Sequence, residues 1–553
     1  MKKYILLLII YSLFPAPHSL LYADSDFSLR IAPALQAPLA EELINPGIGA
    51  NVSLDWAFWD FAPYFTLGAN AGGAFASLPV QVGDPLTLFE GNVGLFLRWR
   101  PSYLLWKHAE RWAFQAGMNG GLYQYSRGEN SDTSGLFGGS LGAQFHLSPY
   151  FSLYAEGGFT RRAFASRSLN TFNAAIGLRL NLSEIMGGRS RVNIEKTQQH
   201  RVFPVSWAWY EHNPVAMVQI TNDEPNTITD VNISFFMDSY MSRPWTFAVV
   251  PRLTPGESIE LPVTALFNEA MMNLTETVNA NGVIQMQYRS LGARKETATP
   301  IQMPIFHRNT LSWDDDRRAA AFVSPRDSAA RMFARHVASA VNSEQVIVNR
   351  EGRTGGLGAL STIPANVVHA AALFEALRLY GISYVVVPAT SFAHVSADES
   401  ALDNVSFPYQ ALYYRGGDCS YLAILFCSML EALDIASAFI TIPGHIYIAV
   451  EVGDDNWQVS NNNIIELEDS DGIRRRWLPI EITVPGEGFT RAWRIGAQQW
   501  HSTGAEAELI PIREAWQVYP PVTAPSSGDR LPQMPGREEI LRALQNEIVQ
   551  VNR

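Results

Sequence analysis

Charged residues and cysteine are both scarce in this sequence. Only 17% of its 553 residues are charged, against 47% hydrophobic, a balance that fits a chain lying partly in lipid. Its two cysteines, Cys419 and Cys427, are eight residues apart on one predicted helix. That spacing is a rise of about 12 Å, too far for a disulfide. A disulfide-stabilised fold is therefore excluded, and Cys427 is predicted to be a core residue.

Positive charge and long hydrophobic runs are also lacking. The net charge of −12 argues against nucleic acid as a partner. Lys2 and Lys3 precede the apolar run Tyr4–Phe14, which is too short to span a bilayer and is typical of a secretory signal. We expect residues 1–23 to be removed after Ala23. No other segment has the pattern of a transmembrane helix, and no cysteine near the cleavage site would carry a lipid anchor.

Residues 24–187 show apolar residues at every second position. Val93, Leu95, Leu97 and Trp99 share one face, opposite Gly94, Phe96, Arg98 and Arg100. A period of two with one apolar face predicts half-buried strands. Eight such runs are present, at about 27–36, 47–58, 62–76, 86–100, 111–126, 134–147, 150–163 and 171–183. The pattern predicts an all-β barrel of eight antiparallel strands.

The links between these runs indicate an outer-membrane barrel. Every second link contains proline and is predicted to be tight, and the others are more polar. Five tryptophans would lie near the inner rim: Trp56, Trp59, Trp99, Trp106 and Trp112. With eight strands the lumen is filled by side chains, so we expect an anchor in outer-membrane lipid and not a pore. A soluble eight-stranded barrel that binds a small ligand is the alternative.

Residues 188–310 contain short β-type runs divided by turn signals such as Thr254-Pro255-Gly256-Glu257. This spacing predicts an all-β sandwich. The segment resembles the immunoglobulin-like spacer domains of exported bacterial proteins. A spacer and a binding module are the two functions left open for it.

A possible nucleophile and a possible base lie within the stretch from Gly416 to His445. Asp418 is a plausible N-cap, which places Cys419 in the first turn of a helix. The unpaired N–H groups and the dipole of a helix start stabilise a thiolate, so we expect a lowered thiol pKa. A β-type run, Ser437–Ile442, follows the helix. His445 then begins a second run, where its ring would be able to serve as base.

This pattern resembles the transglutaminase-like superfamily, which shares the papain-type arrangement of cysteine enzymes. Members carry Gly-Asp-Cys at a helix start, Gly-His on the next strand and an acid on the strand after it. That strand often ends in Trp-x-Pro-x-Asp-x-Thr, which matches Trp477-Leu478-Pro479-Ile480-Glu481-Ile482-Thr483 with Glu in place of Asp. The resemblance covers residues 311–520 and implies an α+β fold.

The resemblance also implies a set of site residues. Cys419 would be the nucleophile, His445 the base and Glu481 the acid that orients it; Asn461 is the alternative third member. Gln410 is a possible oxyanion donor, with a structural hydrogen bond to the nearby loop as the other reading. Neither a cofactor nor a metal is expected for this chemistry. Residues 521–553 are predicted to be a linker and a C-terminal helix.

Acyl transfer through a thioester is the function that the resemblance implies, and bacterial members favour hydrolysis over cross-linking. The expected location is the outer membrane with the C-terminal domains in the periplasm, so the substrate would be a peptide, a protein or a peptidoglycan stem peptide. Two other functions stay open. One is a non-catalytic tethering or binding protein that keeps the fold, and the other is an adhesin-like role of the barrel.

Overall fold

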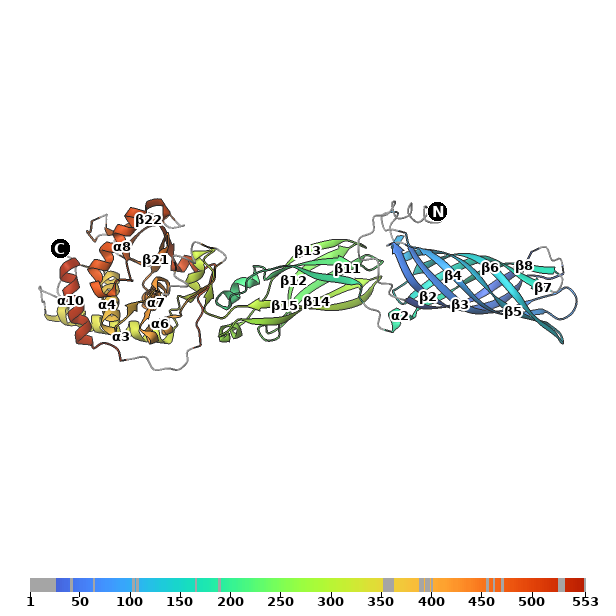
Figure 1. The fold of residues 1–553 in the computed structure, drawn as a ribbon, viewed down its shortest axis with the longest axis horizontal. Helices are drawn as coiled ribbons and strands as arrows, with labels where there is room; N and C mark the ends of the chain where they lie inside the picture. The colour runs from blue at the N-terminus through green and yellow to red at the C-terminus, as the bar shows by residue number, and fades with distance from the viewer. Residues whose placement is uncertain are drawn as a thin grey trace.

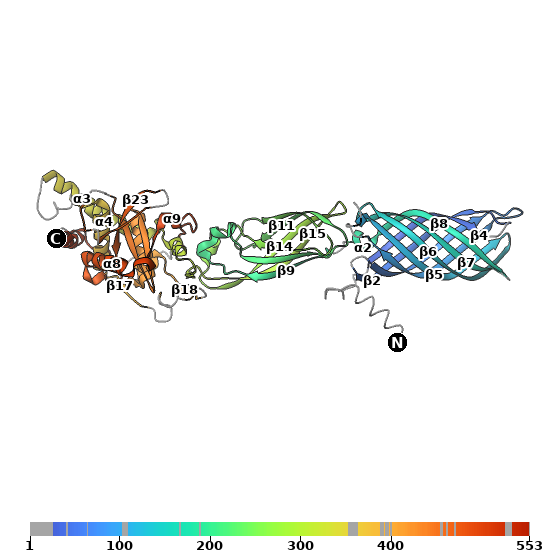
Figure 2. The same ribbon diagram turned by 90° about the horizontal axis from the view of Figure 1, so that it is seen from above.

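The computed structural model arranges the chain as three bodies in a row (Figures 1 and 2). A barrel comes first, a pair of sheets lies in the middle, and a mixed helix and sheet domain lies at the far end. The predicted signal peptide, Trp106 and Asn461 lie outside the described residues. The structure describes residues 26–39, 43–62, 65–101, 105, 109–164, 167–186, 190–351, 363–386, 392, 398, 401–453, 457–460, 463–468, 472–525 and 533–551.

Eight antiparallel strands close into a barrel, with the first strand paired to the last. The prediction of an eight-stranded closed barrel is confirmed. The strands are β1 (Asp26–Pro38), β2 (Gly47–Ala62), β3 (Phe65–Leu78), β4 (Leu86–Trp99), β5 (Trp112–Arg127), β6 (Asn130–His146), β7 (Phe151–Phe164) and β8 (Arg167–Asn181).

The barrel is apolar outside and polar inside. On its outer face Val93 and Ile176 are 65% and 70% exposed, whereas Arg98 on the inner face is 1% exposed. Inside, the Asp55 carboxylate faces Arg30, Arg98 and Arg179 at 3.0, 3.9 and 3.5 Å. These paired charges fill the lumen at the level of Asp55.

The lengths of the connections differ from the predicted contrast of tight and polar links. The β5–β6 link is only Gly128-Glu129, because Gly128 has a positive φ of 60° that permits a two-residue hairpin turn. The β4–β5 link spans residues 100–111 instead of being tight. Glu110 in this link accepts a hydrogen bond from Thr227 of the middle body at 2.6 Å, so the extra length makes a contact between bodies.

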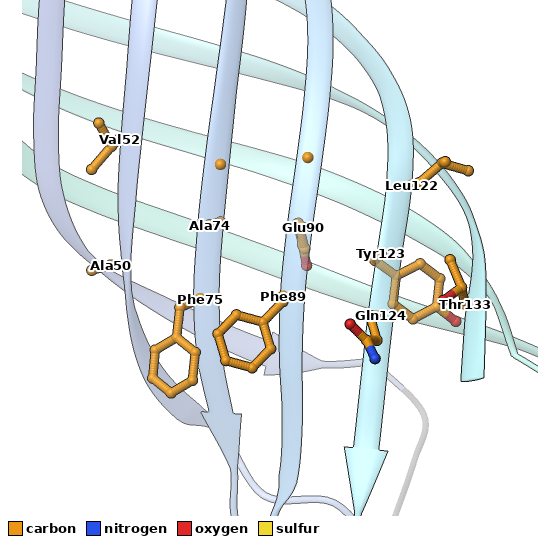
Figure 3. A pocket seen from close by; sticks show the side chains of 12 residues that line it. Ala50, Val52, Ala74, Phe75, Phe89, Glu90, Leu122, Tyr123, Gln124 and Thr133 are labelled. Atoms are coloured by element: carbon orange, nitrogen blue, oxygen red, sulfur yellow. The ribbon is translucent and has the colours of Figure 1, made fainter. Parts of the chain in front are cut away.

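A hollow of about 650 Å³ lies on the outer wall of the barrel (Figure 3). Gly73 and Gly91 lack side chains there, and Phe75 and Phe89 stand beside the gap with ring centroids 5.0 Å apart. Its outward-facing side chains are mostly apolar, so the hollow is part of the barrel's apolar outer surface.

The middle body consists of two antiparallel sheets that share one hydrophobic core. The exposed faces of its first and last strands carry many charged and polar residues. A short 3₁₀ turn, η3 (Glu269–Asn273), also belongs to this body. The strands are β9 (Val192–Gln199), β10 (Ala216–Asn222) and β13 (Ser258–Val263) in one sheet, and β12 (Trp245–Leu253), β11 (Ile228–Phe236), β14 (Val278–Ser290) and β15 (Ala293–Ile305) in the other.

The C-terminal domain is built on a five-stranded antiparallel sheet in the order β22-β23-β21-β20-β24. Its strands are β20 (Ser437–Ile442), β21 (His445–Glu451), β22 (Ile465–Glu468), β23 (Arg474–Ile480) and β24 (Glu508–Pro511). Its main helices are α3 (Ser328–Glu351), α4 (Ala365–Tyr380), α6 (Pro408–Tyr414), α7 (Cys419–Glu431), α8 (Phe489–Thr503) and α10 (Arg537–Val551).

Smaller elements complete the description. A pair of two-residue strands, β17 (Ser383–Tyr384) and β19 (Gly416–Gly417), runs parallel just before α7. Within the described residues, no helix combines the length and the apolar character needed to cross a membrane. The remaining short elements are α2 (Leu182–Ile185), α9 (Ile512–Ala515), β16 (Thr310–Leu311), β18 (Asp403–Asn404), η1 (Ala109–Arg111), η2 (Pro204–Glu211), η4 (Asp316–Phe322), η7 (Pro485–Glu487) and η8 (Gly504–Glu506).

Candidate active site

Cys419 is the first residue of α7, as the sequence predicted. Asp418 is the N-cap, and its Oδ1 accepts the backbone N–H of Tyr421 at 3.0 Å and the Ser420 hydroxyl at 2.7 Å. The apolar residues that follow bury the rest of the helix against the sheet. The nucleophile candidate is therefore held at a helix start within the domain core.

His445 begins β21 because the chain reverses in two residues. Pro443-Gly444 joins β20 to β21, and Gly444 has the positive φ of 75° that the second turn position requires. The His445 ring lies 2.7 Å from Glu481, between Nε2 and Oε2. A carboxylate only accepts hydrogen bonds, so Nε2 donates the proton in this contact.

Glu481, directly after β23, is fixed from several sides. Its Oε1 accepts the Thr483 backbone N–H at 3.0 Å and the Thr483 hydroxyl at 2.6 Å. Its own backbone N–H donates to Ala492 of α8 at 3.1 Å. Gly496 permits this close approach, since a Cβ there would lie 3.1 Å from the Glu481 nitrogen.

The carboxylate of Glu481 is held in its charged form. Burial by itself raises the pKa of Glu481, but the hydrogen bond and charge of His445, together with Thr483, outweigh burial and leave the pKa below its usual value. Glu481 is only 1% exposed, so few water molecules compete for these hydrogen bonds. The arrangement suits a residue that orients an imidazole.

The thiol differs from the expectation of a lowered pKa. Cys419 is 3% exposed, and burial together with the charges of Asp418 and Glu481 raises its pKa to about 12. Backbone N–H groups of Ile446 and Ser420 act in the opposite direction but are outweighed. The effect of the helix start is thus smaller than the cost of burying a charged sulfur beside a carboxylate. The contact with Ile446 places the sulfur beside the start of β21.

Gln410 lies in the first turn of α6, and its side chain holds the helix start and a neighbouring segment together. Its Oε1 accepts the backbone N–H of Phe407 and the side-chain amide of Asn309, each at 2.8 Å. These bonds match the structural alternative, and its role as an oxyanion donor stays a prediction. The competing third member of the triad, Asn461, cannot be placed because it lies outside the described residues.

Tyr384 is a residue near the thiol that sequence analysis did not single out. Tyr384 is paired with Gly417 in β17 and β19, and Gly417 is two residues before Cys419. The Tyr384 side chain is 40% exposed. Burial raises the pKa of Tyr384, and so do the nearby thiol, Asp418 and Glu481. The sequence signal for this strand pair was Gly416-Gly417. A Cβ on Gly416 would lie 3.1 Å from the backbone oxygen of Ser383, so glycine allows the two strands to approach closely.

Metal-ligating side chains do not gather at this site. Across the part of the chain that the structure describes, no group of three or more His, Cys, Asp or Glu residues could hold a metal ion. The chemistry available from the side chains in place is that of a thiol, an imidazole and a carboxylate.

No family model and no curated protein matches the chain. Among solved structures it matches Neisserial surface protein A, at 10% identity over 28% of this chain and 96% of that one, with a TM-score of 0.21. It matches the attachment invasion locus protein Ail of Yersinia pestis at 14% identity over 29% and 100% of the two chains, with a TM-score of 0.20. A third match is the outer membrane protease OmpT of Escherichia coli, at 10% identity over 28% and 95%, with a TM-score of 0.16.

Similarities at this level carry no argument about this chain, and the barrel rests on its own strand pairing. The transglutaminase-like assignment of residues 311–520 and the immunoglobulin-like assignment of residues 188–310 stay predictions.

Proposed function

We propose that this protein is an outer-membrane-anchored cysteine enzyme that cleaves peptide amide bonds on the periplasmic side. The apolar outer face of the barrel supports the anchor. Aromatic side chains gather at the end nearest the middle body, where Trp99 stacks on Phe114 and Trp112 packs on Phe145. Aromatic girdles of this kind mark a membrane interface.

The even number of strands supports the orientation. β1 begins and β8 ends at the same end of the barrel, and the middle body follows from there. An even number of antiparallel strands brings both chain ends to one side of the membrane, and we place that side in the periplasm. With this orientation the C-terminal domain lies in the periplasm.

The reaction is acyl transfer. The Cys419 sulfur attacks an amide carbonyl carbon while His445 takes the thiol proton, giving a tetrahedral intermediate. The carbon–nitrogen bond then breaks, and His445 returns the proton to the leaving amine. Water attacks the resulting thioester, releases the acid and restores the thiol. Glu481 holds the ring throughout, and hydrolysis is proposed in preference to transfer to a second amine.

The His445–Glu481 contact, made beside the strand start that touches Cys419, is the observation that carries this proposal. The raised pKa of the thiol means that the resting sulfur is protonated, so His445 acts as a general base during attack. Burial of Cys419 equally supports a second function, a non-catalytic envelope-tethering protein with the same fold.

Thiol alkylation separates the two functions. Iodoacetamide labelling at neutral pH, located by mass spectrometry, is compared in the full-length protein and in His445→Ala. Catalysis predicts that labelling of Cys419 depends on His445, with Cys427 as an unlabelled internal control because it is fully buried. Labelling of Cys419 that is slow and equal in both proteins removes the enzyme proposal.

A further inference from the structure

The middle body is joined to the barrel by a set of buried charges. Lys295 of β15 lies 3.0 Å from Glu184, which follows the last barrel strand, and 3.2 Å from Glu224 of the middle body. The Lys295 and Glu224 side chains are only 9% and 4% exposed. The Tyr288 hydroxyl also donates to Glu224 at 2.8 Å. The Lys295–Glu184 pair is the one that crosses the joint, with Glu184 21% exposed, and the buried Lys295–Glu224 pair within the middle body holds Lys295 in place for it.

Two further contacts brace the same joint. Arg191 lies 3.6 Å from Asp60 at the end of β2, and Thr227 donates to Glu110 of the β4–β5 link. Three periplasm-facing parts of the barrel, near residues 60, 110 and 184, therefore touch the middle body. Contacts on three sides restrain rotation as well as bending.

The joint to the C-terminal domain is a continuous core. Val202 and Tyr210 belong to the core of the middle body, whereas Phe203 and Val205 belong to the core of the C-terminal domain. Neighbouring residues thus anchor in different domains, which leaves no flexible linker between them.

The Arg318 guanidinium packs between the middle body and the C-terminal domain at this second joint. The Arg318 side chain lies over the rings of Trp209 and Tyr519, at 5.1 and 5.2 Å from their centroids. Trp209 comes from η2 and Tyr519 from the end of the C-terminal domain. The same guanidinium lies 3.0 Å from Asp314, so stacking and charge both hold it.

From these two joints we propose that the middle body is a rigid spacer between the barrel and the C-terminal domain, called the standoff below. The β14 and β15 strands have 13 residues each and run along the long axis of the molecule. At about 3.3 Å per residue they span about 43 Å. The standoff holds the C-terminal domain at least about 40 Å from the barrel's membrane face.

The distance at which the standoff holds the site from the membrane limits which substrates the site reaches. The inference rests on the proposed function, because it assumes the membrane anchor and the peptide-cleaving thiol. A site held at that height does not reach lipids or the short surface loops of membrane proteins. Among the expected substrates this height favours a peptide of the cell-wall polymer, which lies away from the membrane.

A tethered-reagent experiment tests the height directly. Tyr384→Cys is placed in a Cys419→Ser background, and the full chain is folded into phosphatidylethanolamine–phosphatidylglycerol vesicles. The vesicles carry lipids with a maleimide on tethers of increasing length. We expect labelling at residue 384 only with tethers longer than about 40 Å. Labelling by the shortest tethers overturns the standoff.

Two control variants show whether the labelling depends on the distance from the membrane. Met186→Cys, at an 86% exposed position beside the barrel, should react with the shortest tether. A flexible Gly-Ser insertion of about 20 residues directly after Met186 should let the reporter at 384 react with short tethers, because such a chain bends freely. If the insertion changes nothing, the joint was not rigid and the inference fails.

Failure of the proposed function is seen separately. The reporter experiment lacks the Cys419 thiol, so its outcome does not depend on catalysis. A loss of His445-dependent labelling of Cys419 would remove the enzyme and leave the standoff intact.

Discussion

Glu481 holds His445 through a single bond of 2.7 Å between Oε2 and Nε2, and Thr483 occupies the other carboxylate oxygen. The ring thereby donates its Nε2 proton to the carboxylate. Glu481→Gln keeps the size of the side chain but removes its charge, so an imidazolium is no longer stabilised. We expect peptide cleavage to fall by about a hundredfold or more.

Cleavage rates on a model stem peptide, with folding monitored by circular dichroism, test this prediction. Thr483→Val, which removes only the hydroxyl bond, is the matched control and should have a smaller effect. Equal activity of Glu481→Gln and the unmodified protein would mean that this carboxylate is structural.

Acid should weaken the fold partly through the same carboxylate. Its pKa in the folded chain is below the ordinary 4.5, so its contribution to the free energy of unfolding is fully present above that pH. The contribution is lost as the pH falls through the folded-state pKa. The difference in melting temperature between the unmodified protein and Glu481→Gln should therefore shrink below about pH 4.5. Melting temperatures measured at intervals of about 1 pH unit test this prediction. A difference that stays constant from about pH 3 to about pH 7 would contradict it.

Asp418→Asn should make the thiol more reactive. Asparagine caps a helix about as well as aspartate, so α7 should keep its N-terminus. The substitution removes a negative charge beside a buried sulfur, and Asp418 is one of the causes that raise the Cys419 pKa. Alkylation of Cys419 near pH 8 should be several-fold faster than in the unmodified protein.

The rate of alkylation as a function of pH measures this effect, with Asp434→Asn at the exposed far end of the helix as control. An unchanged profile in Asp418→Asn would show that the Asp418 charge does not contribute to the raised thiol pKa.

The free energy of unfolding of the barrel should depend on Asp55. This carboxylate is fully buried and faces three arginines, so Asp55→Asn takes this partner from Arg98 and Arg179, while Arg30 keeps Glu156. Breaking a buried ion pair costs about 3–5 kcal/mol. Urea unfolding of the vesicle-bound protein, followed by tryptophan fluorescence, should show that loss, while exposed Asp132→Asn should change little.

Local patterns in the sequence were enough for the elements that carry the chemistry. Alternation at positions such as Val93 and Arg98 indicated barrel strands and their faces. The order Asp418-Cys419 before an apolar run indicated a capped helix, and the second apolar run after Ser437–Ile442 placed His445 at the start of a strand. Such signals depend on neighbours within a few residues, which is why they survive without knowledge of the fold.

Packing decided the remaining features. The contact between His445 and Glu481 exists because β21 and β23 pair in the sheet although 36 residues separate the two side chains. The thiol pKa depends on burial and on a carboxylate brought alongside, and these outweigh the local effect of the helix start. The sequence by itself determined which residues have the chemistry for acyl transfer, and the tertiary structure decided their partners and charge states, because distance and dielectric are set by the whole fold.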